Sequence, residues 1–188
     1  MTAPLRVIAF CGSLRKGSFT RALLRAAIEQ APPELQILVW DRLGELPLYN
    51  ADLDVDPRPE PVVALRAALA QSDAVLYASP EYNYSIPGVL KNMIDWGSRP
   101  QPTPPLKGMP AAVMGLSAGI GGSMRMQYHL RQVAVILNQP MMPQPEVIIP
   151  KGPERFDATG TLTDASTRDL LSRFMAAFAA WVRQHPRT

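Results

Sequence analysis

The segment with the most chemical character is residues 12–20, Gly-Ser-Leu-Arg-Lys-Gly-Ser-Phe-Thr. It follows a short apolar run and precedes a stretch of helical spacing, which predicts a turn between a strand and a helix start. Gly12 and Gly17 are expected to supply backbone angles that other residues avoid. Three hydroxyls can donate hydrogen bonds, and Arg15 and Lys16 add positive charge. Free N–H groups and the helix dipole favour an anion there, so the segment is predicted to bind a phosphate.

Two familiar phosphate-binding motifs do not match this segment. A Walker loop needs a lysine directly after its second glycine, and here Ser18 follows Gly17, which argues against a nucleoside triphosphate. The dinucleotide fingerprint fails because Leu14 stands where a glycine is required. A single terminal phosphate, as in a mononucleotide, fits better. The structural alternative is a turn that binds nothing, in which a serine caps the following helix.

Length and composition are typical of one globular domain over residues 1–188. The net charge is +3, but the basic residues are scattered along the chain, which argues against a nucleic-acid-binding face. The single cysteine, Cys11, allows no intrachain disulfide and is interpreted as a small buried hydrophobe. No apolar run reaches the roughly 18 residues of a membrane span. We therefore expect a cytoplasmic protein with no membrane span.

Apolar runs alternate with stretches of helical period along the chain. The runs predict five strands, at residues 5–11, 35–40, 74–78, 111–116 and 146–149. The helical stretches predict five helices, at about residues 18–31, 61–70, 88–96, 123–138 and 163–183. Residues 99–110 are rich in proline and are predicted to be a surface connection with little regular structure. The alternation predicts an α/β fold, with a parallel sheet between two layers of helices.

Three loops are expected to meet at one edge of this sheet, because ligands of such sheets bind beyond the carboxyl ends of the strands. They are residues 12–20, 79–84 and 117–122. The first offers a phosphate site, the second two tyrosine rings and an amide, and the third a glycine-rich backbone against which a flat ligand can lie. A phosphate at one end and a planar heterocycle at the other is the shape of FMN. Taken alone, the tyrosines fit core packing with surface hydroxyls equally well.

Metal binding finds little support in the sequence. Asp52, Asp54 and Asp56 have the spacing that opens a calcium loop, but Pro57 replaces the glycine that such a loop requires. A solvated acidic loop is therefore the better interpretation. The two histidines lie far apart, without a cysteine or carboxylate at ligand spacing. We predict no metal site.

Four segments resemble the NAD(P)H-dependent FMN reductase family, in its quinone and chromate reductase branch. They are residues 12–19, residues 80–92 (Pro-Glu-Tyr-Asn-Tyr-Ser-Ile-Pro-Gly-Val-Leu-Lys-Asn), residues 94–96 (Ile-Asp-Trp) and residues 128–132 (Tyr-His-Leu-Arg-Gln). The resemblance extends over nearly the whole chain. It implies a flavodoxin-like fold with strand order 2-1-3-4-5, bound FMN, and NAD(P)H as the electron donor.

The family pattern also implies which residues hold the cofactor. It places the FMN phosphate against Ser13, Arg15, Ser18, Phe19 and Thr20. The family usually has asparagine at the last of these positions, and a threonine hydroxyl can still donate. The pattern places the isoalloxazine ring and the ribityl chain beside Pro80, Glu81, Tyr82, Asn83 and Tyr84, with Ser117 and the glycines after it on the other side of the ring. Because the cofactor carries the chemistry, no catalytic acid or base is assigned.

The resemblance implies a ping-pong oxidoreductase that takes a hydride from NAD(P)H and passes two electrons to quinones, chromate, azo compounds or free flavin. It also implies a homodimer or homotetramer, with contacts through the helices that follow Pro87 and Gly122. The alternative is a flavodoxin-type electron carrier without NAD(P)H reductase activity. Flavodoxins are generally acidic, whereas this chain is slightly basic. A binding module without flavin is a third interpretation.

Overall fold

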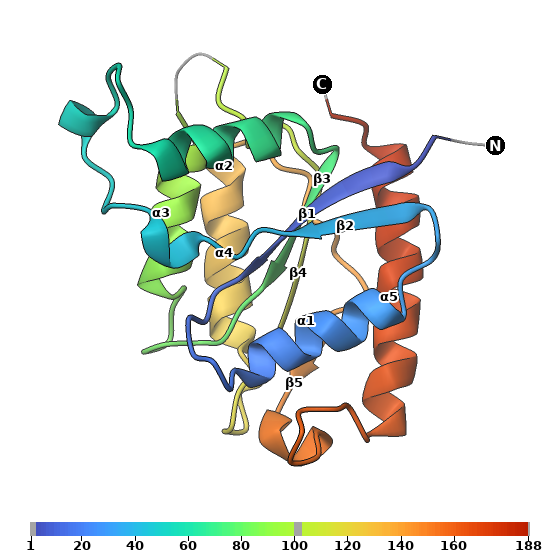
Figure 1. The fold of residues 1–188 in the computed structure, drawn as a ribbon. Coiled ribbons are helices and arrows are strands. Elements are labelled where there is room, and N and C mark those ends of the chain that lie inside the picture. Colours follow the sequence, from blue (N-terminus) through green and yellow to red (C-terminus); the bar gives the residue numbers. More distant parts are fainter. Residues whose placement is uncertain (1–2, 100–102, 188) are drawn as a thin grey trace.

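The computed structural model describes residues 3–99 and 103–187. Within these ranges the chain forms a parallel five-stranded sheet with the strand order β2-β1-β3-β4-β5 (Figure 1). The strands are β1 (Leu5–Cys11), β2 (Leu35–Val39), β3 (Ala74–Ala78), β4 (Ala111–Leu116) and β5 (Val147–Ile149). The predicted α/β class and the flavodoxin-like strand order are confirmed.

Helices cover both faces of the sheet. In the described residues they are α1 (Phe19–Glu29), α2 (Glu60–Ala70), α3 (Gly88–Gly97), α4 (Met124–Ile136) and α5 (Ala165–Gln184). The buried residues of α1 and α5 form one core cluster with the sheet, and those of α2, α3 and α4 form the other (Figure 1). Each predicted strand and helix is found, and the observed ends differ from the predicted ones by no more than two residues.

The central strands are buried on both faces. In β1, Val7 and Ala9 belong to the α1 and α5 side of the core, while Ile8 and Phe10 belong to the opposite side. Successive side chains of a strand point to opposite faces, so a strand between two helical layers needs an apolar residue at every position. This explains why the central strands are continuous apolar runs in the sequence.

The proline-rich connection differs from its prediction. Residues 100–102 lie outside the described residues, and residues 103–110 have little regular structure, as expected. However, Leu106 and Met109 are fully buried in the core cluster that lies on the α2, α3 and α4 side of the sheet. The prediction of a surface connection is wrong for these two side chains, because proline content indicates an irregular backbone and not exposure to solvent.

The segment between β2 and α2 contains two short 3₁₀ helices, Leu43–Glu45 and Ala51–Leu53, which the sequence did not predict. The side chains of α3 fix this segment in place. The carbonyl oxygen of Pro47 accepts hydrogen bonds from Asn92 Nδ2 at 2.9 Å and from Trp96 Nε1 at 2.8 Å. The long loop is therefore ordered by two donors on one neighbouring helix.

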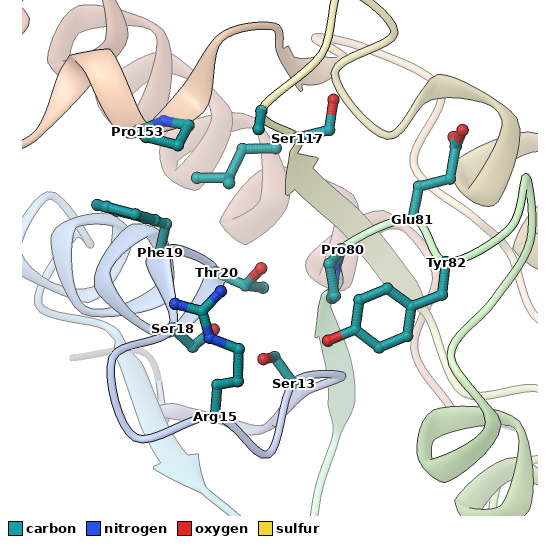
Figure 2. A pocket seen from close by; sticks show the side chains of 12 residues that line it. Ser13, Arg15, Ser18, Phe19, Thr20, Pro80, Glu81, Tyr82, Ser117 and Pro153 are labelled. Atoms are coloured by element: carbon teal, nitrogen blue, oxygen red, sulfur yellow. The ribbon is translucent and has the colours of Figure 1, made fainter.

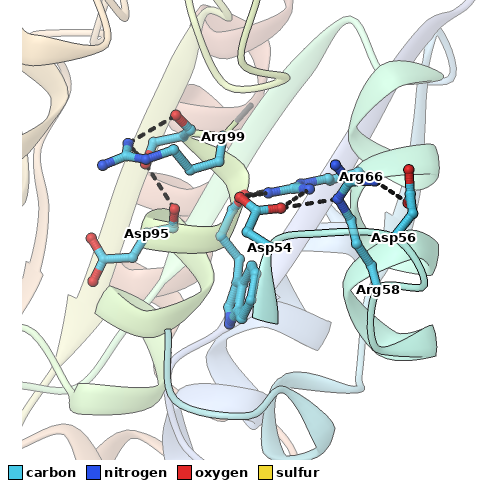
Figure 3. A network of polar contacts seen from close by, with 8 residues as sticks. Asp54, Asp56, Arg58, Arg66, Asp95 and Arg99 are labelled. Atoms are coloured by element: carbon cyan, nitrogen blue, oxygen red, sulfur yellow. Dashed lines mark hydrogen bonds and ion pairs between the residues drawn. The ribbon is translucent and has the colours of Figure 1, made fainter. Parts of the chain in front are cut away.

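Asp54 anchors the end of the same segment (Figure 3). Its two carboxylate oxygens accept hydrogen bonds from Arg66 Nη1 at 2.7 Å and Nη2 at 2.9 Å, and Arg58 Nε donates to one of them at 3.0 Å. Hydrogen bonding to Arg66 holds the pKa of the Asp54 carboxyl below its ordinary value. The side chain of Asp54 is only 11% exposed, so the prediction of a solvated acidic loop is wrong at this residue.

Two features that would bear on function are absent from residues 3–99 and 103–187. No helix there is long and apolar enough to cross a membrane. The same residues contain no group of three or more histidine, cysteine, aspartate or glutamate side chains that could hold a metal ion.

Candidate functional site

A pocket of about 230 Å³ lies at the carboxyl ends of β1, β3 and β4 (Figure 2). Residues from all three predicted loops line it. The lining residues are Ser13, Arg15, Ser18, Phe19, Thr20, Pro80, Glu81, Tyr82, Leu116, Ser117, Ala118 and Pro153. Nine of the eleven residues named from the sequence are among them.

The first loop offers the pocket many hydrogen-bond donors. Across residues 13–20, no backbone N–H group donates to an acceptor within the described chain. Ser18 caps α1, since its hydroxyl accepts a hydrogen bond from the backbone N–H of Arg21 at 3.3 Å. A turn of free N–H groups at the start of an eleven-residue helix has the chemistry of an anion site.

Two hydroxyls of this loop also lack a partner. The side chains of Ser13 and Thr20 are nearly buried, at 3% and 2% exposure, and neither hydroxyl forms a hydrogen bond within the described residues. Figure 2 shows Arg15 on the same side of the pocket as Ser18 and Thr20. The guanidinium donates to the carbonyl oxygen of Gly17 at 3.2 Å, so the arginine folds back over its own loop. The lower part of the pocket is therefore rich in donors and positively charged.

The glycines of the first loop serve a different purpose from the predicted one. Neither Gly12 nor Gly17 has a positive φ angle. A Cβ atom at Gly12 would lie 2.7 Å from Ser79 Oγ, so this glycine allows the carboxyl ends of β1 and β3 to approach each other. The expectation of unusual backbone angles is wrong for both residues. The need for Gly12 arises from a contact distant in sequence.

The second loop supplies Pro80, Glu81 and Tyr82 to the pocket. The carboxylate of Glu81 points away from the cavity (Figure 2) and accepts a hydrogen bond from Arg125 Nη1 at 2.7 Å. Tyr82 is 47% exposed and borders the open side. Glu81 is the one carboxylate among the lining residues, and its ion pair keeps the charge of the pocket positive.

Asn83 and Tyr84, also named from the sequence, do not line this pocket. They form a two-residue turn in which both φ angles are positive, at 49° and 65°. In the third loop only Ser117 and Ala118 reach the pocket, and the glycines that follow do not. The backbone N–H of Gly152 donates to the carbonyl oxygen of Ser117 at 2.8 Å, which holds this loop against the segment after β5.

Three lining residues were not named as site residues from the sequence: Leu116, Ala118, which lies within the predicted loop 117–122, and Pro153. Pro153 belongs to a short 3₁₀ helix, Gly152–Arg155, directly after β5. The rule that placed the other loops, binding beyond the carboxyl ends of strands, applies equally to this segment. This rule could have indicated Pro153 from the sequence, but the segment after β5 has no hydroxyl or glycine pattern that would have drawn attention to it.

Cys11 lies at the end of β1 and is almost fully buried. Burial raises the pKa of its thiol, so the sulfur stays protonated at neutral pH and is a poor nucleophile. This agrees with the interpretation of Cys11 as a small apolar residue.

Residues 5–154 match the sequence model of the family described as NADPH-dependent FMN reductase. The chain belongs to this family. The family binds FMN and depends on NAD(P)H, and the protein is accordingly an enzyme of this reductase family. The recognition drawn from the four sequence segments is confirmed.

Individual members of the FMN reductase family match along nearly their full length. The chain is 45% identical over 184 residues to an NAD(P)H-dependent FMN reductase of Pseudomonas aeruginosa, covering 98% of each chain. It is 38% identical over 186 residues to a quinone reductase of Escherichia coli, again covering 98% of each. Among solved structures, the flavoenzyme NAD(P)H:acceptor oxidoreductase FerB of Paracoccus denitrificans superposes with a TM-score of 0.89 and 38% identity, over 97% of this chain and 99% of that one.

Proposed function

We propose that the protein is an FMN-dependent NAD(P)H oxidoreductase that passes two electrons to quinones by a ping-pong mechanism, with residues 1–188 acting as one flavodoxin-like domain. The observation that carries the proposal is the donor-rich first loop. Unpartnered N–H groups and the unpartnered hydroxyls of two pocket-lining residues, Ser13 and Thr20, lie close to the start of α1. This donor set suits a phosphate, and membership of a family that binds FMN supports FMN as the source of that phosphate.

The residues present fit FMN. Ser13, Ser18 and Thr20 with the free N–H groups would hold the phosphate, and Arg15 would add a charge-assisted hydrogen bond. Pro80 and Tyr82 on one side, and Ser117 and Ala118 on the other, would border the rest of the molecule. A pocket of about 230 Å³ is below the usual size of sites that enclose a whole ligand, so it would leave part of FMN open to solvent.

When bound, FMN supplies the chemistry, accepting a hydride from the nicotinamide and returning two electrons to an acceptor. The chain would position FMN and set the charge around it. Its donors fix the phosphate end, and the backbone of residues 80–82 borders the pocket while the Glu81 carboxylate is held away from it by Arg125. The Glu81 carboxylate, the one carboxylate among the lining residues, is therefore engaged in an ion pair.

The range of electron acceptors that we propose follows from the open side of the pocket. Two relatives are named quinone reductases and cover almost the whole chain, which supports quinones as acceptors. A flavin ring at an open edge is reached by any oxidant that fits beside Tyr82 and Ala118, both exposed. We therefore include chromate, azo compounds and free flavin in the proposed acceptor set.

Subunit association is part of the proposal, as a homodimer or homotetramer through α3 and α4. The outer surface of α4 supports it, because Val135 and Ile136 are 76% and 86% exposed and Tyr128 is 53% exposed. Apolar side chains grouped on one helix are typical of interaction surfaces. Light scattering on the FMN-loaded protein tests this part. The cytoplasmic location stays a prediction from the sequence.

A stopped-flow experiment tests the central reaction. The FMN-loaded protein is mixed without oxygen with NADPH and, separately, with NADH, while the visible absorbance of the flavin is followed. The proposal predicts direct bleaching by at least one nucleotide and recovery of the absorbance when a quinone is added. A flavin that neither nucleotide bleaches would indicate the flavodoxin-type carrier instead. A colourless protein that takes up no FMN would indicate the flavin-free module.

A further inference from the structure

The turn after β3 has an uncommon backbone. The N–H and C=O groups of Tyr82 and Ser85 exchange hydrogen bonds of 3.1 and 3.0 Å, which closes a two-residue hairpin. Both central residues, Asn83 and Tyr84, have positive φ, the signature of a type I′ turn. Asparagine tolerates this region, but a tyrosine there is disfavoured and persists only when its surroundings hold it. Some contact outside the turn must therefore stabilise it.

That contact comes from one face of α4. Arg125 and His129 are four residues apart and thus lie on the same side of the helix. The guanidinium of Arg125 stacks 3.7 Å from the centre of the Tyr84 ring. His129 Nδ1 lies 2.8 Å from Ser85 Oγ. The last two residues of the turn are each held by one α4 side chain.

Helix α4 depends on the same loop in return. Its N-cap residue, Ser123, is in the left-handed region and makes no capping hydrogen bond with its side chain. Glu81 takes over this function, since its Oε2 accepts the backbone N–H of Met126 at 3.1 Å. A carboxylate at a helix start is stabilising, because it satisfies a free N–H group and meets the positive end of the dipole. Loop and helix therefore form one unit.

We propose that Ser85 and His129 are positioning residues for the FMN site. Their hydrogen bond holds the Tyr82 to Ser85 turn against α4 and so sets the backbone of residues 80–82, which line the pocket. The inference rests on the proposed function. Neither Ser85 nor His129 lines the pocket, so any effect on the cofactor must pass through the turn. Glu81 and Arg125 are less suitable probes, because their removal also disturbs the start of α4.

The Ser85 to His129 contact does not require one protonation state. The serine hydroxyl can donate to an unprotonated Nδ1, or a protonated Nδ1 can donate to the hydroxyl oxygen. An asparagine side chain carries a polar atom close to the position of Nδ1 and can take part in either arrangement. His129→Asn should therefore preserve the function that His129→Ala removes.

The test uses the FMN-loaded protein and five variants: His129→Ala, Ser85→Ala, the double variant, His129→Asn and, as control, Gln132→Ala. Gln132 is an exposed residue of the same helix, and its side chain forms no hydrogen bond or ion pair with another described residue. The FMN dissociation constant, the flavin absorbance spectrum and the flavin reduction potential are measured. The thermal midpoint of the FMN-free protein reports separately on folding.

We expect each alanine variant to raise the dissociation constant about threefold to tenfold and to shift the flavin spectrum and potential. The double variant should be no worse than either single one, because both remove the same contact. His129→Asn and Gln132→Ala should match the wild type. Wild-type FMN binding in both alanine variants, or additive effects in the double variant, would overturn the positioning role of Ser85 and His129. Either result would leave the proposed function standing. A wild-type protein that takes up no FMN would overturn the proposed function and, with it, this inference.

Discussion

Two polar regions of the molecule, the loop around Asp54 and the first loop at residues 13–20, are similarly exposed. They differ in whether their hydrogen-bonding groups have partners within the protein. Around Asp54, each carboxylate oxygen and the guanidinium of Arg66 has a protein partner, and Arg66 also reaches the carbonyl oxygen of Trp96 at 3.3 Å (Figure 3). In the first loop, residues 13–20 leave their N–H groups without acceptors (Figure 2). The first region satisfies its own polar groups, whereas the second leaves donors that we propose bind the phosphate of FMN.

The difference separates a polar group that stabilises the fold from one that serves binding. A buried donor without a partner costs folding free energy, whereas a paired one contributes modestly. The hydroxyls of Ser13 and Thr20 have no acceptor within the described residues and lie on the wall of the pocket, so a ligand there can accept from them. Variants of the Asp54 region should change stability and leave FMN affinity unchanged, and variants of the first loop should do the reverse.

The largest effect is expected from Asp54→Ala. Removing the carboxylate leaves the Arg66 side chain, 12% exposed, without its ionic partner, and the free energy of unfolding should fall by about 3 kcal/mol. Urea denaturation measures this. Asp52→Ala is the matched control, because Asp52 is exposed and its carboxylate has no partner in the described residues. If Asp54→Ala loses FMN affinity at a temperature where the variant is folded, the Asp54 region does not serve stability alone, and the distinction between the two regions is wrong.

The same carboxylate makes stability depend on pH. Its pKa is lowered in the folded protein, mainly by the hydrogen bond to Arg66, so its contribution is complete above the ordinary aspartate pKa of about 3.9. The contribution is lost as the pH falls through the lower, folded-state value. The stability difference between the wild type and Asp54→Asn should thus shrink by on the order of 1 kcal/mol between neutral pH and acid. A difference that is constant with pH would show that the ion pair does not titrate.

In the first loop, Arg15→Ala should weaken FMN binding about tenfold, because a charge-assisted hydrogen bond to the phosphate is lost. The urea midpoint of the FMN-free protein should not change, since Arg15 is exposed and bonds only within its own loop. Lys16→Ala is the control: it has the same charge and neighbours Arg15 but does not line the pocket. Equal losses in the two variants would indicate a general electrostatic effect and not a contact of Arg15.

The smallest effect is expected from Thr20→Asn, which restores the residue usual in the family. Thr20 is 2% exposed, and the longer amide must fit where the methyl and hydroxyl now lie. Because both side chains can donate to the phosphate, FMN affinity should change by only about threefold. Thr20→Val keeps the shape and removes the donor, and it should cost about tenfold. If Thr20→Val binds FMN like the wild type, the hydroxyl is not a phosphate ligand.

Local sequence features predicted the elements well. The apolar runs and helical periods placed every strand and α-helix of the described residues, because a sheet covered on both faces needs continuous apolar strands. Strand order needed the family resemblance, since it depends on pairing between distant segments. Burial of Leu106 and Met109 could not be predicted either, because only the folded chain shows which helix lies over them.

The lining of the candidate pocket was predicted only in part, because some of its residues are brought together by distant segments. Ser13, Ser18 and Thr20 lie within one loop, so their spacing alone indicated an anion site. Pro153 was missed because the connection between β5 and α5 carries it back across the pocket. The hydrogen bond between Ser85 and His129 joins residues 44 positions apart, and no local pattern in the sequence indicates it.

The central claim is that the first loop holds the phosphate of FMN, and an equilibrium titration of the FMN-free protein with FMN and with riboflavin tests it most directly. Riboflavin has the same ring and lacks the phosphate. We predict one FMN bound per chain and riboflavin binding weaker by about 100-fold or more, since the unpartnered donors of residues 13–20 then find no anion. Equal affinity for the two flavins would contradict the claim.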